Sequence, residues 1–187
     1  MNKKYIVALA VILSGCAGMM NVRTREAVVT KTQLNEDSFK KVSWLNGPTM
    51  KASTLTEASK KDHSDWQVHA YFLRAMKDQK SGQGFIQLYV SHEDTDWLFF
   101  NSAVDSDGTS LEFTRLNQEA STATQYGAGI VEDFALSMNE DYLRKKAKDG
   151  LTIRVYGKKG NRMLAVPGYY IQGFLDRYET FKTNAAL

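Results

Sequence analysis

The chain contains little cysteine and little proline: one Cys and two Pro among 187 residues. A single cysteine excludes an intramolecular disulfide framework and a cysteine-rich metal site. Basic residues exceed acidic ones by only 24 to 21, an imbalance too small for a dedicated nucleic-acid-binding protein. With one continuously apolar stretch, the chain cannot be a polytopic membrane protein. Its 43% of hydrophobic residues predict one globular domain, which at this length buries about 70% of its unfolded surface.

The first residues have the order of a secretory signal. Lys3 and Lys4 precede an apolar run from Ile6 to Leu13, and no acidic residue occurs before Glu26. A helix of that length rises only about 12 Å, whereas the hydrocarbon core of a bilayer is ~30 Å thick. The run is therefore too short to span a membrane, and a basic start before a short apolar run indicates export.

The apolar run ends in four residues of distinctive order, Leu13-Ser14-Gly15-Cys16. This tetrapeptide resembles the lipobox of bacterial lipoprotein precursors. The resemblance implies cleavage before Cys16, a diacylglyceryl thioether on its sulfur, and an acyl chain such as palmitate on the new amine. Three acyl chains anchor a protein stably, and lipidation would remove the one oxidisable thiol. The alternative interpretation is an ordinary signal peptide with a cysteine at this position by chance.

The resemblance also gives a location and a division of the chain. Ala17, rather than aspartate, follows the cysteine, and the sorting pattern of such lipoproteins then implies the outer membrane, with the domain facing the periplasm. Residues 1–15 are expected to be the signal peptide and 16–22 a lipidated tether. Residues 23–187 are expected to form one periplasmic α+β domain, in which the polar segment 49–65 is a loop.

Alternation of apolar and polar residues predicts strands through most of this domain. Asp105–Gly108 is expected to be a hairpin turn, because Asp-Gly suits a turn that needs positive φ. Residues 117–129 show no clear period and are expected to be irregular, and 130–136 form a strand or the entry to a helix. The expected strands lie at 27–30, 66–72, 86–91, 97–104, 109–116, 130–136, 151–155 and 163–166.

Two helices are predicted late in the chain. Ser137–Glu140 fits a capping box, in which the first and fourth side chains cap backbone amides, and Gly150 ends that helix. Pro167 opens the second, where aromatic residues recur at helical spacing as one apolar stripe: Tyr170, Phe174, Tyr178 and Phe181. The predicted fold class is therefore α+β: a mainly antiparallel β-sheet or sandwich with two C-terminal helices.

Between about residues 85 and 178, the chain carries one ordered series of aromatic, glycine and other residues. The series is Trp97, Phe100, Ala103, Gly108, Leu111, Glu132, Leu143, Gly150, Gly157, Pro167, Tyr170, Gly173, Phe174 and Leu175. The series resembles a broad group of proteobacterial envelope proteins of unknown function. The shared positions are structural in type, so the resemblance implies a fold and a location and transfers no catalytic residue. Some members carry a cysteine pair in the segment matching 117–129, which this chain lacks.

Acidic residues gather in two neighbouring segments. One spans residues 92–96, and the other is the turn with Asp105 and Asp107. A hard cation takes six to eight oxygen ligands, which two adjacent loops could supply. An EF-hand pattern fails, however, because placing Asp107-Gly108 at its fifth and sixth positions puts Ala103 first and Thr114 last. The favoured interpretation is two solvated turns, capped by their own Asp side chains, with no metal site.

Histidines could act as zinc ligands or catalytic groups, and serines as catalytic nucleophiles. His63, His69 and His92 are the only histidines, and none pairs at a helical step, so no zinc site is predicted. No G-x-S-x-G motif occurs. A hydrolase site built from His92, Glu93, Asp94 and Asp96 remains as an alternative, provided that Glu93, Asp94 or Asp96 converges with His92 or Asp105 in one cleft.

Basic residues are the remaining candidates. Gly157–Gly160 joins two short strands and is predicted to be a hairpin turn rather than a phosphate-binding loop. It lies near a helix rich in lysine, so a basic face could contact a partner protein or anionic head groups. The alternative is a solvated face without a partner. The candidate contact residues are Lys145, Lys146, Lys148, Lys158, Lys159, Arg162 and Tyr169.

The sequence therefore predicts a lipid-anchored envelope protein, non-catalytic, that binds a partner or supports an assembly. No catalytic residue, metal or cofactor is expected apart from the lipid on Cys16. The expected partners are the membrane, through the anchor, and an envelope protein, but not nucleic acid. Two alternatives stay open: the hydrolase described above, and a lipid or lipopolysaccharide carrier, which needs an apolar cavity between sheet and helices.

Overall fold

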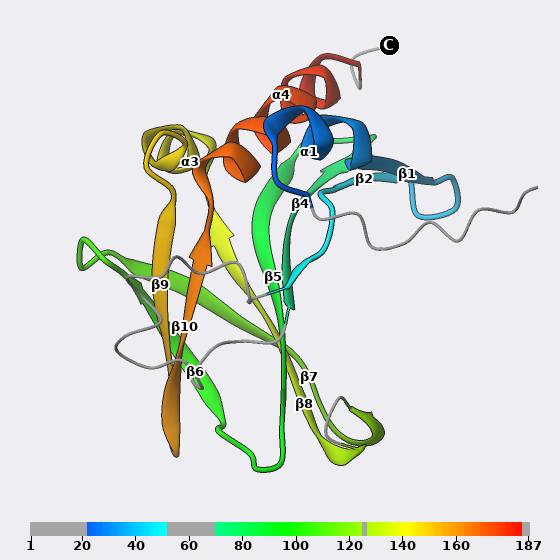
Figure 1. Ribbon diagram of the computed structural model, residues 1–187. Helices are drawn as coiled ribbons and strands as arrows, with labels where there is room; N and C mark the ends of the chain where they lie inside the picture. The colour runs from blue at the N-terminus through cyan, green and yellow to red at the C-terminus, as the bar shows by residue number, and fades with distance from the viewer. Residues whose placement is uncertain (1–21, 52–69, 125–126, 185–187) are drawn as a thin grey trace, which may run out of the picture.

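Strands make up most of the described chain, and the helices lie together at one end of the molecule (Figure 1). The computed structural model describes residues 22–51, 70–124 and 127–184. The helices are α1 (Arg25–Lys31), α3 (Glu140–Lys146) and α4 (Gly168–Asn184). The strands are β1 (Gln33–Asp37), β2 (Val42–Asn46), β3 (Met50–Lys51), β4 (Ala70–Asp78), β5 (Gly84–Asp94), β6 (Phe100–Asp105), β7 (Ser110–Thr124), β8 (Gly127–Met138), β9 (Leu151–Gly157) and β10 (Gly160–Val166).

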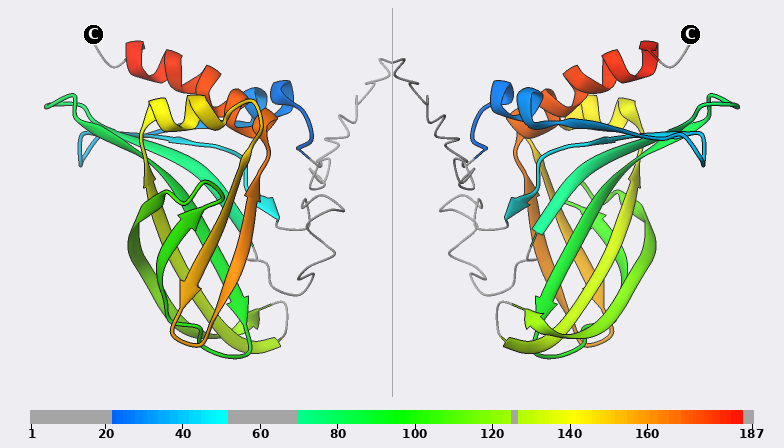
Figure 2. Two further views of the ribbon diagram at one scale, coloured as in Figure 1. Left: turned by 90° about the vertical axis from the view of Figure 1, so that its left-hand side faces the viewer. Right: turned by 90° about the vertical axis from the view of Figure 1, so that its right-hand side faces the viewer.

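All of these strands pair antiparallel in one sheet. Their order is β1-β2-β4-β5-β8-β7-β6-β9-β10, and β3 pairs with β4 off this path. The sheet curls, so that β9 and β10 face β4 and β5 across a shared interior (Figures 1 and 2). A hydrogen bond joins the two sides: the Tyr71 hydroxyl on β4 donates to the Ala165 carbonyl on β10 at 2.9 Å. The predicted α+β fold with a mainly antiparallel sheet is confirmed.

The core fills the inside of the curled sheet, and α4 covers its helical end. Alternate strand residues such as Leu73, Leu88 and Leu136 are buried there, as the period of two requires. On α4, Tyr170 and Phe174 are fully buried, which confirms the predicted stripe as core. The Tyr170 hydroxyl donates to the Pro48 carbonyl at 2.9 Å and accepts the Leu73 amide at 3.1 Å. Burial raises the pKa of this phenol, so it stays protonated.

The first helix corrects a prediction. Residues 27–30 belong to α1 and not to a strand, although Val28, Val29 and Thr30 are β-formers. Thr24 caps the helix, because its side-chain oxygen accepts the Ala27 amide at 3.2 Å. Packing decides the rest: α1 lies against α4 at Gly173, where a Cβ would come within 2.6 Å of the Val28 Cβ.

The segment expected to be irregular is also ordered as strand. Residues 117–124 continue β7, and 127–129 begin β8. The two strands pair from Glu112–Ser137 to Thr124–Gly127, with register shifts that bend the ribbon. Many side chains of this part of β7 are exposed, so it shows no apolar period that would have marked it as a strand.

The two later helices lie where they were predicted, with one change of boundary. Asn139 caps α3, since its side-chain oxygen accepts the Tyr142 amide at 2.8 Å, whereas Ser137 belongs to β8. The capping box was therefore placed two residues too early. Gly150 follows α3 with φ +85°, a conformation that glycine adopts without strain. None of α1, α3 and α4 combines the length and the apolar character needed to cross a bilayer.

Candidate functional site

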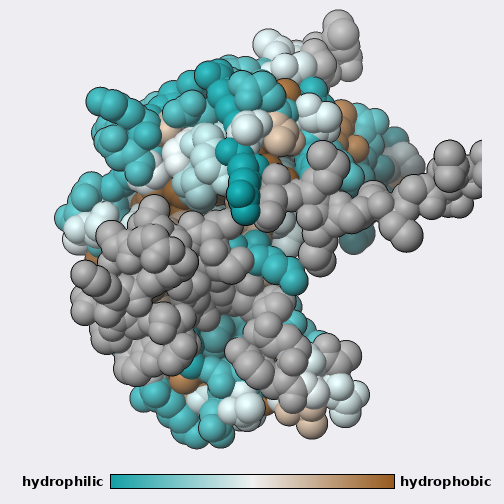
Figure 3. Space-filling model, in the orientation of Figure 1, coloured by the Kyte–Doolittle hydropathy of each residue, from teal (hydrophilic) through white to brown (hydrophobic). Residues whose placement is uncertain are grey.

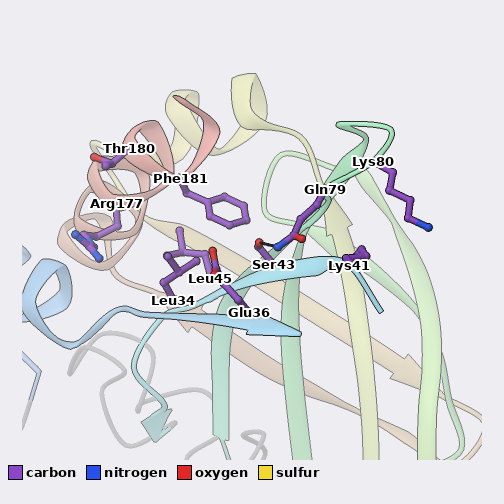
Figure 4. Close-up of a pocket in the computed structure, with 10 residues that line it drawn as sticks. All are labelled: Leu34, Glu36, Lys41, Ser43, Leu45, Gln79, Lys80, Arg177, Thr180 and Phe181. Atoms are coloured by element: carbon purple, nitrogen blue, oxygen red, sulfur yellow. Dashed lines mark hydrogen bonds between the residues drawn. The ribbon is translucent and has the colours of Figure 1, made fainter. Parts of the chain in front are cut away.

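A groove of about 540 Å³ lies between the β1–β2 hairpin and the C-terminal half of α4 (Figure 4). Its volume falls within the ~300–1,000 Å³ typical of ligand pockets. The apolar part of its lining comes from three elements: Leu34 on β1, Leu45 on β2 and Phe181 on α4. Figure 4 shows the Phe181 ring turned into the groove, toward the strand that carries Ser43 and Leu45.

Strand register explains why these side chains share one face. Leu34 is opposite Leu45, and Glu36 is opposite Ser43, so all four point to the side of the sheet that α4 covers. The cover is incomplete: Leu45 is 1% exposed, whereas Leu34 at the sheet edge is 49% exposed. The groove is the part of this interface that α4 leaves open.

Hydrogen bonds join the β1–β2 hairpin to the β4–β5 hairpin at one end of the groove. The Gln79 amide donates to the Lys41 carbonyl at 2.8 Å, and the Gln79 side chain donates from Nε2 to Ser43 Oγ at 3.0 Å. These bonds hold the β1–β2 hairpin beside the β4–β5 hairpin. They also place Lys41 and Lys80 on the same rim.

Positive charge dominates the lining of the groove. Lys41, Lys80 and Arg177 line it, and Glu36 is the only acidic residue that lines it among those the structure describes. Hydrophilic side chains also cover most of the helical end in the view of Figure 3, where apolar surface shows as small separate patches. The groove thus combines an apolar floor with a cationic rim, a pairing that suits an anionic and partly apolar ligand.

Arg177 is the most distinctive of these cations. Its Nε is buried and makes no hydrogen bond to any of the described residues. The two nearby acidic residues of α4 are engaged elsewhere: Asp176 pairs with Arg25 at 2.6 Å, and Glu179 pairs with Lys182 at 3.1 Å and with Arg144. Arg177 is therefore part of the groove lining and has no carboxylate partner in the described chain.

The outer wall of the groove is a sheet edge. β1 stands first in the strand order, so its second edge pairs with no strand of the described ranges. An edge strand presents backbone N–H and C=O groups that can pair with another chain. Leu34 and Glu36 project from this edge strand into the groove.

Two residues of the hydrolase alternative, His92 and Asp94, lie side by side in an ion-pair cluster. His92 is buried on β5, and its Nε2 lies 3.3 Å from Asp94 Oδ2. Arg162 of β10 donates to the same oxygen. Burial alone would raise the pKa of Asp94, but hydrogen bonds from the Thr95 amide and from Arg162 hold it below its ordinary value. Asp94 is thus a fixed anion in an ion pair.

Glu132 completes this cluster from β8, where it lies opposite His92. It is buried, and its carboxylate accepts the backbone amides of Leu98 at 2.8 Å and Phe100 at 3.3 Å. Gln118 Nε2 also donates to it at 2.8 Å. The carboxylate fixes the chain between β5 and β6, which is a positioning role.

The second acidic group lies at the opposite end of β6. Asp105 is buried and accepts the Thr109 amide at 2.7 Å, the Tyr142 hydroxyl at 2.8 Å and Lys146 at 3.1 Å. Burial would raise the pKa of Asp105, but these bonds together hold it far below its ordinary value. Burial and the bond to Asp105 raise the pKa of Tyr142.

The convergence that this alternative requires is therefore met in part, since Asp94 lies 3.3 Å from His92. Asp105 and Asp107 pair with Lys146, and Asp94 pairs with Arg162 at the other end of β6. Glu93 lies opposite Val131 on the outer face, and Asp96 is exposed in a bend. Among the described residues, no group of three or more His, Cys, Asp or Glu could hold a metal ion.

The structure also separates the candidate basic residues. Lys145 and Lys148 are exposed on and after α3, whereas Lys158 and Lys159 form the turn at the far end of β9, about 20 Å away along the strand (Figure 1). Lys146 and Arg162 are engaged in the ion pairs above, and Tyr169 donates to the Val22 carbonyl at 2.9 Å. These residues do not form one basic face. Cys16, His63 and His69 lie outside the described residues.

Sequence reasoning missed the groove, although one signal was present. On α4, the buried stripe continues from Tyr170 and Phe174 to Phe181 at helical spacing, and Arg177 occupies a position on that stripe. A charged residue in an otherwise apolar stripe indicates either a buried ion pair or an opening to solvent or ligand. No family model, no curated protein and no solved structure matches the chain.

Proposed function

We propose that this chain is a lipid-anchored protein of the bacterial envelope that binds another envelope protein and performs no catalysis. Cys16 carries the anchor in this proposal, and the domain faces the periplasm from the outer membrane. The groove between β1 and α4 is the observation that carries the binding part. Within the described ranges, it joins a sheet edge that pairs with no strand to an apolar floor and an arginine without a carboxylate partner. The ion pairs that engage Asp94 and Asp105 support a non-catalytic role.

The anchor is tested by fractionating cells that express the full chain. Cys16→Ala should move the protein from the membrane fraction to the soluble fraction, because no acyl chain can then be attached. Ala17→Asp should keep the protein in membranes but move it to the inner membrane. Unchanged membrane retention of the Cys16→Ala chain would contradict the anchor.

Partner binding is tested by photo-crosslinking in intact cells. A photoreactive residue replaces Leu34 in the groove or, as the matched control, Leu116 on β7, since the two leucines are similarly exposed at 49% and 42%. Leu34 should give a discrete crosslinked protein species that Leu116 does not give. The same crosslinks from both positions, or none from either, would contradict a binding role for the groove.

The groove also favours a second function, transport or sensing of a lipid. Its floor of Leu34, Leu45 and Phe181 could hold an acyl chain beneath a cationic rim. The two functions differ in the ligand that the groove binds: a protein segment in the first and a lipid in the second. Mass spectrometry of the purified chain would show a non-covalent lipid in the second case, and Phe181→Ala would lose it.

A further inference from the structure

We infer that the groove binds an extended peptide segment of the partner, which adds a strand to the edge of β1 that pairs with no described strand and sets an acidic side chain against Arg177. This inference rests on the proposed partner binding and specifies its chemistry. Three features of the site support this inference: its shape, the direction of its side chains and its charge.

The shape favours an extended peptide over a helix or a compact ligand. One wall of the groove is a strand whose outer backbone groups pair with no described strand. An added strand would satisfy those groups by main-chain hydrogen bonds, the usual source of affinity in strand addition. The edge strand has five residues, so it can pair with a segment of about the same length.

The direction of the side chains on β1 determines which residues of the partner segment contact the groove. In the sheet, Leu34 and Glu36 project toward α4, and Gln33, Asn35 and Asp37 project the other way. Because successive residues of a strand point to opposite faces, every second residue of the added strand would enter the groove. Those residues would meet Leu34 and Phe181, and the intervening ones would face solvent.

Charge determines the chemistry of the residues that enter. Arg177 lies in the lining without a carboxylate partner, and Lys41 and Lys80 add positive charge against the single Glu36. A carboxylate would satisfy the buried Arg177 Nε and gain a charge-assisted hydrogen bond. The best segment therefore alternates, with acidic and apolar side chains at the positions that face the groove and small polar ones between them.

The test uses the full chain, purified with its lipid, and a labelled seven-residue peptide. In the peptide, glutamate, leucine and glutamate occupy the alternate positions, and serine occupies the other four. Fluorescence anisotropy at low salt should show saturable binding. The same peptide with lysine in place of both glutamates should not bind, because its charges repel the rim.

Matched variants and a backbone measurement complete the test. Arg177→Gln should weaken binding about tenfold, the size expected for a lost charge-assisted hydrogen bond, whereas Arg154→Gln on the exposed face of β9 should leave it unchanged. Hydrogen exchange should slow for β1 amides when the peptide binds. Binding without that protection, equal binding of the lysine peptide, or full binding by the Arg177→Gln chain would overturn strand addition.

The outcome is separable from that of the proposed function. If Leu34 crosslinks a protein in cells but the peptide leaves β1 exchange unchanged, strand addition fails while partner binding stands. If the purified chain carries a lipid that the peptide does not displace, the groove is a lipid site and the inference is overturned.

Discussion

Arg25 of α1 and Asp176 of α4 form a two-point ion pair, in which Nε donates to Oδ2 at 2.6 Å and Nη2 donates to Oδ1 at 2.7 Å. The pair fastens α1 to α4. It also engages Asp176, the acidic residue next to Arg177 in sequence. Arg25 is thus bonded within the fold, whereas Arg177 has no ion-pair partner among the described residues.

Substitution should separate these roles. Arg177→Gln is expected to leave the free energy of unfolding within about 0.5 kcal/mol of the parent, because the side chain has no ion-pair partner among the described residues. Arg25→Gln should lower stability slightly, by an amount that shrinks in high salt as an exposed ion pair requires. Urea unfolding at two salt concentrations measures both, and a large loss for Arg177→Gln would show a structural role for that arginine.

Gly173 should tolerate no side chain. A Cβ at this position would lie 2.6 Å from the Arg25 carbonyl oxygen and from the Val28 Cβ, so α1 would have to move away from α4. Gly173→Ala is expected to cost about 1–3 kcal/mol by overpacking. Thr180→Ala on the exposed side of the same helix is the control and should change stability by less than about 0.5 kcal/mol. Equal values for both in denaturant unfolding would contradict the close approach of the two helices.

Two phenylalanines at the same end of the molecule should differ sharply. Phe181 is 7% exposed and packs in the core cluster, whereas Phe39 in the β1–β2 turn is 97% exposed. Phe181→Ala should cost about 3 kcal/mol through lost burial and the cavity left behind. Phe39→Ala should stay within about 0.5 kcal/mol. Thermal and urea unfolding of the two variants check this, and a similar loss in both would contradict the placement of α4.

Asp105 should make stability depend on pH. Its pKa is lower in the folded chain than in the unfolded chain, so its ionised form stabilises the fold. That contribution is complete well above the ordinary Asp pKa of ~3.9 and is lost as the pH falls through the lower folded value. Asp105→Asn should therefore destabilise the protein at pH 7, and the difference from the parent should shrink below about pH 4. A difference that stays constant from pH 7 to pH 3 would contradict the sign of the shift.

Much of the fold could be predicted because local pattern and tertiary structure agree in the core. The strands around Leu88 and Ile153 alternate in the sequence as they do in the sheet, and the stripe of α4 packs as its spacing predicted. The predicted secondary structure is wrong where tertiary contacts, rather than the local sequence pattern, determine it. Val28 is a β-former that becomes helical because α1 packs against Gly173, and residues 117–124 form a strand because β8 pairs with them.

The site could not be predicted in the same way, because it arises from contacts between distant segments. Leu34 and Leu45 share a face only through the β1–β2 register, and Phe181 joins them only through the path of α4. The separation of Asp94 from Asp105 likewise depends on β6 running between them. Only Arg177, a charge within an apolar stripe, could have indicated from sequence where the opening lies.

The entry of the chain into the domain gives the groove a mechanical connection. Val22 is held by the Tyr169 hydroxyl, α1 follows three residues later, and Thr32 alone separates α1 from the strand that forms the groove wall. Tension applied at the amino end would reach that wall through one short helix docked on α4. In the proposed anchored protein, the affinity of the groove for a segment would then depend on the tension in the proposed tether.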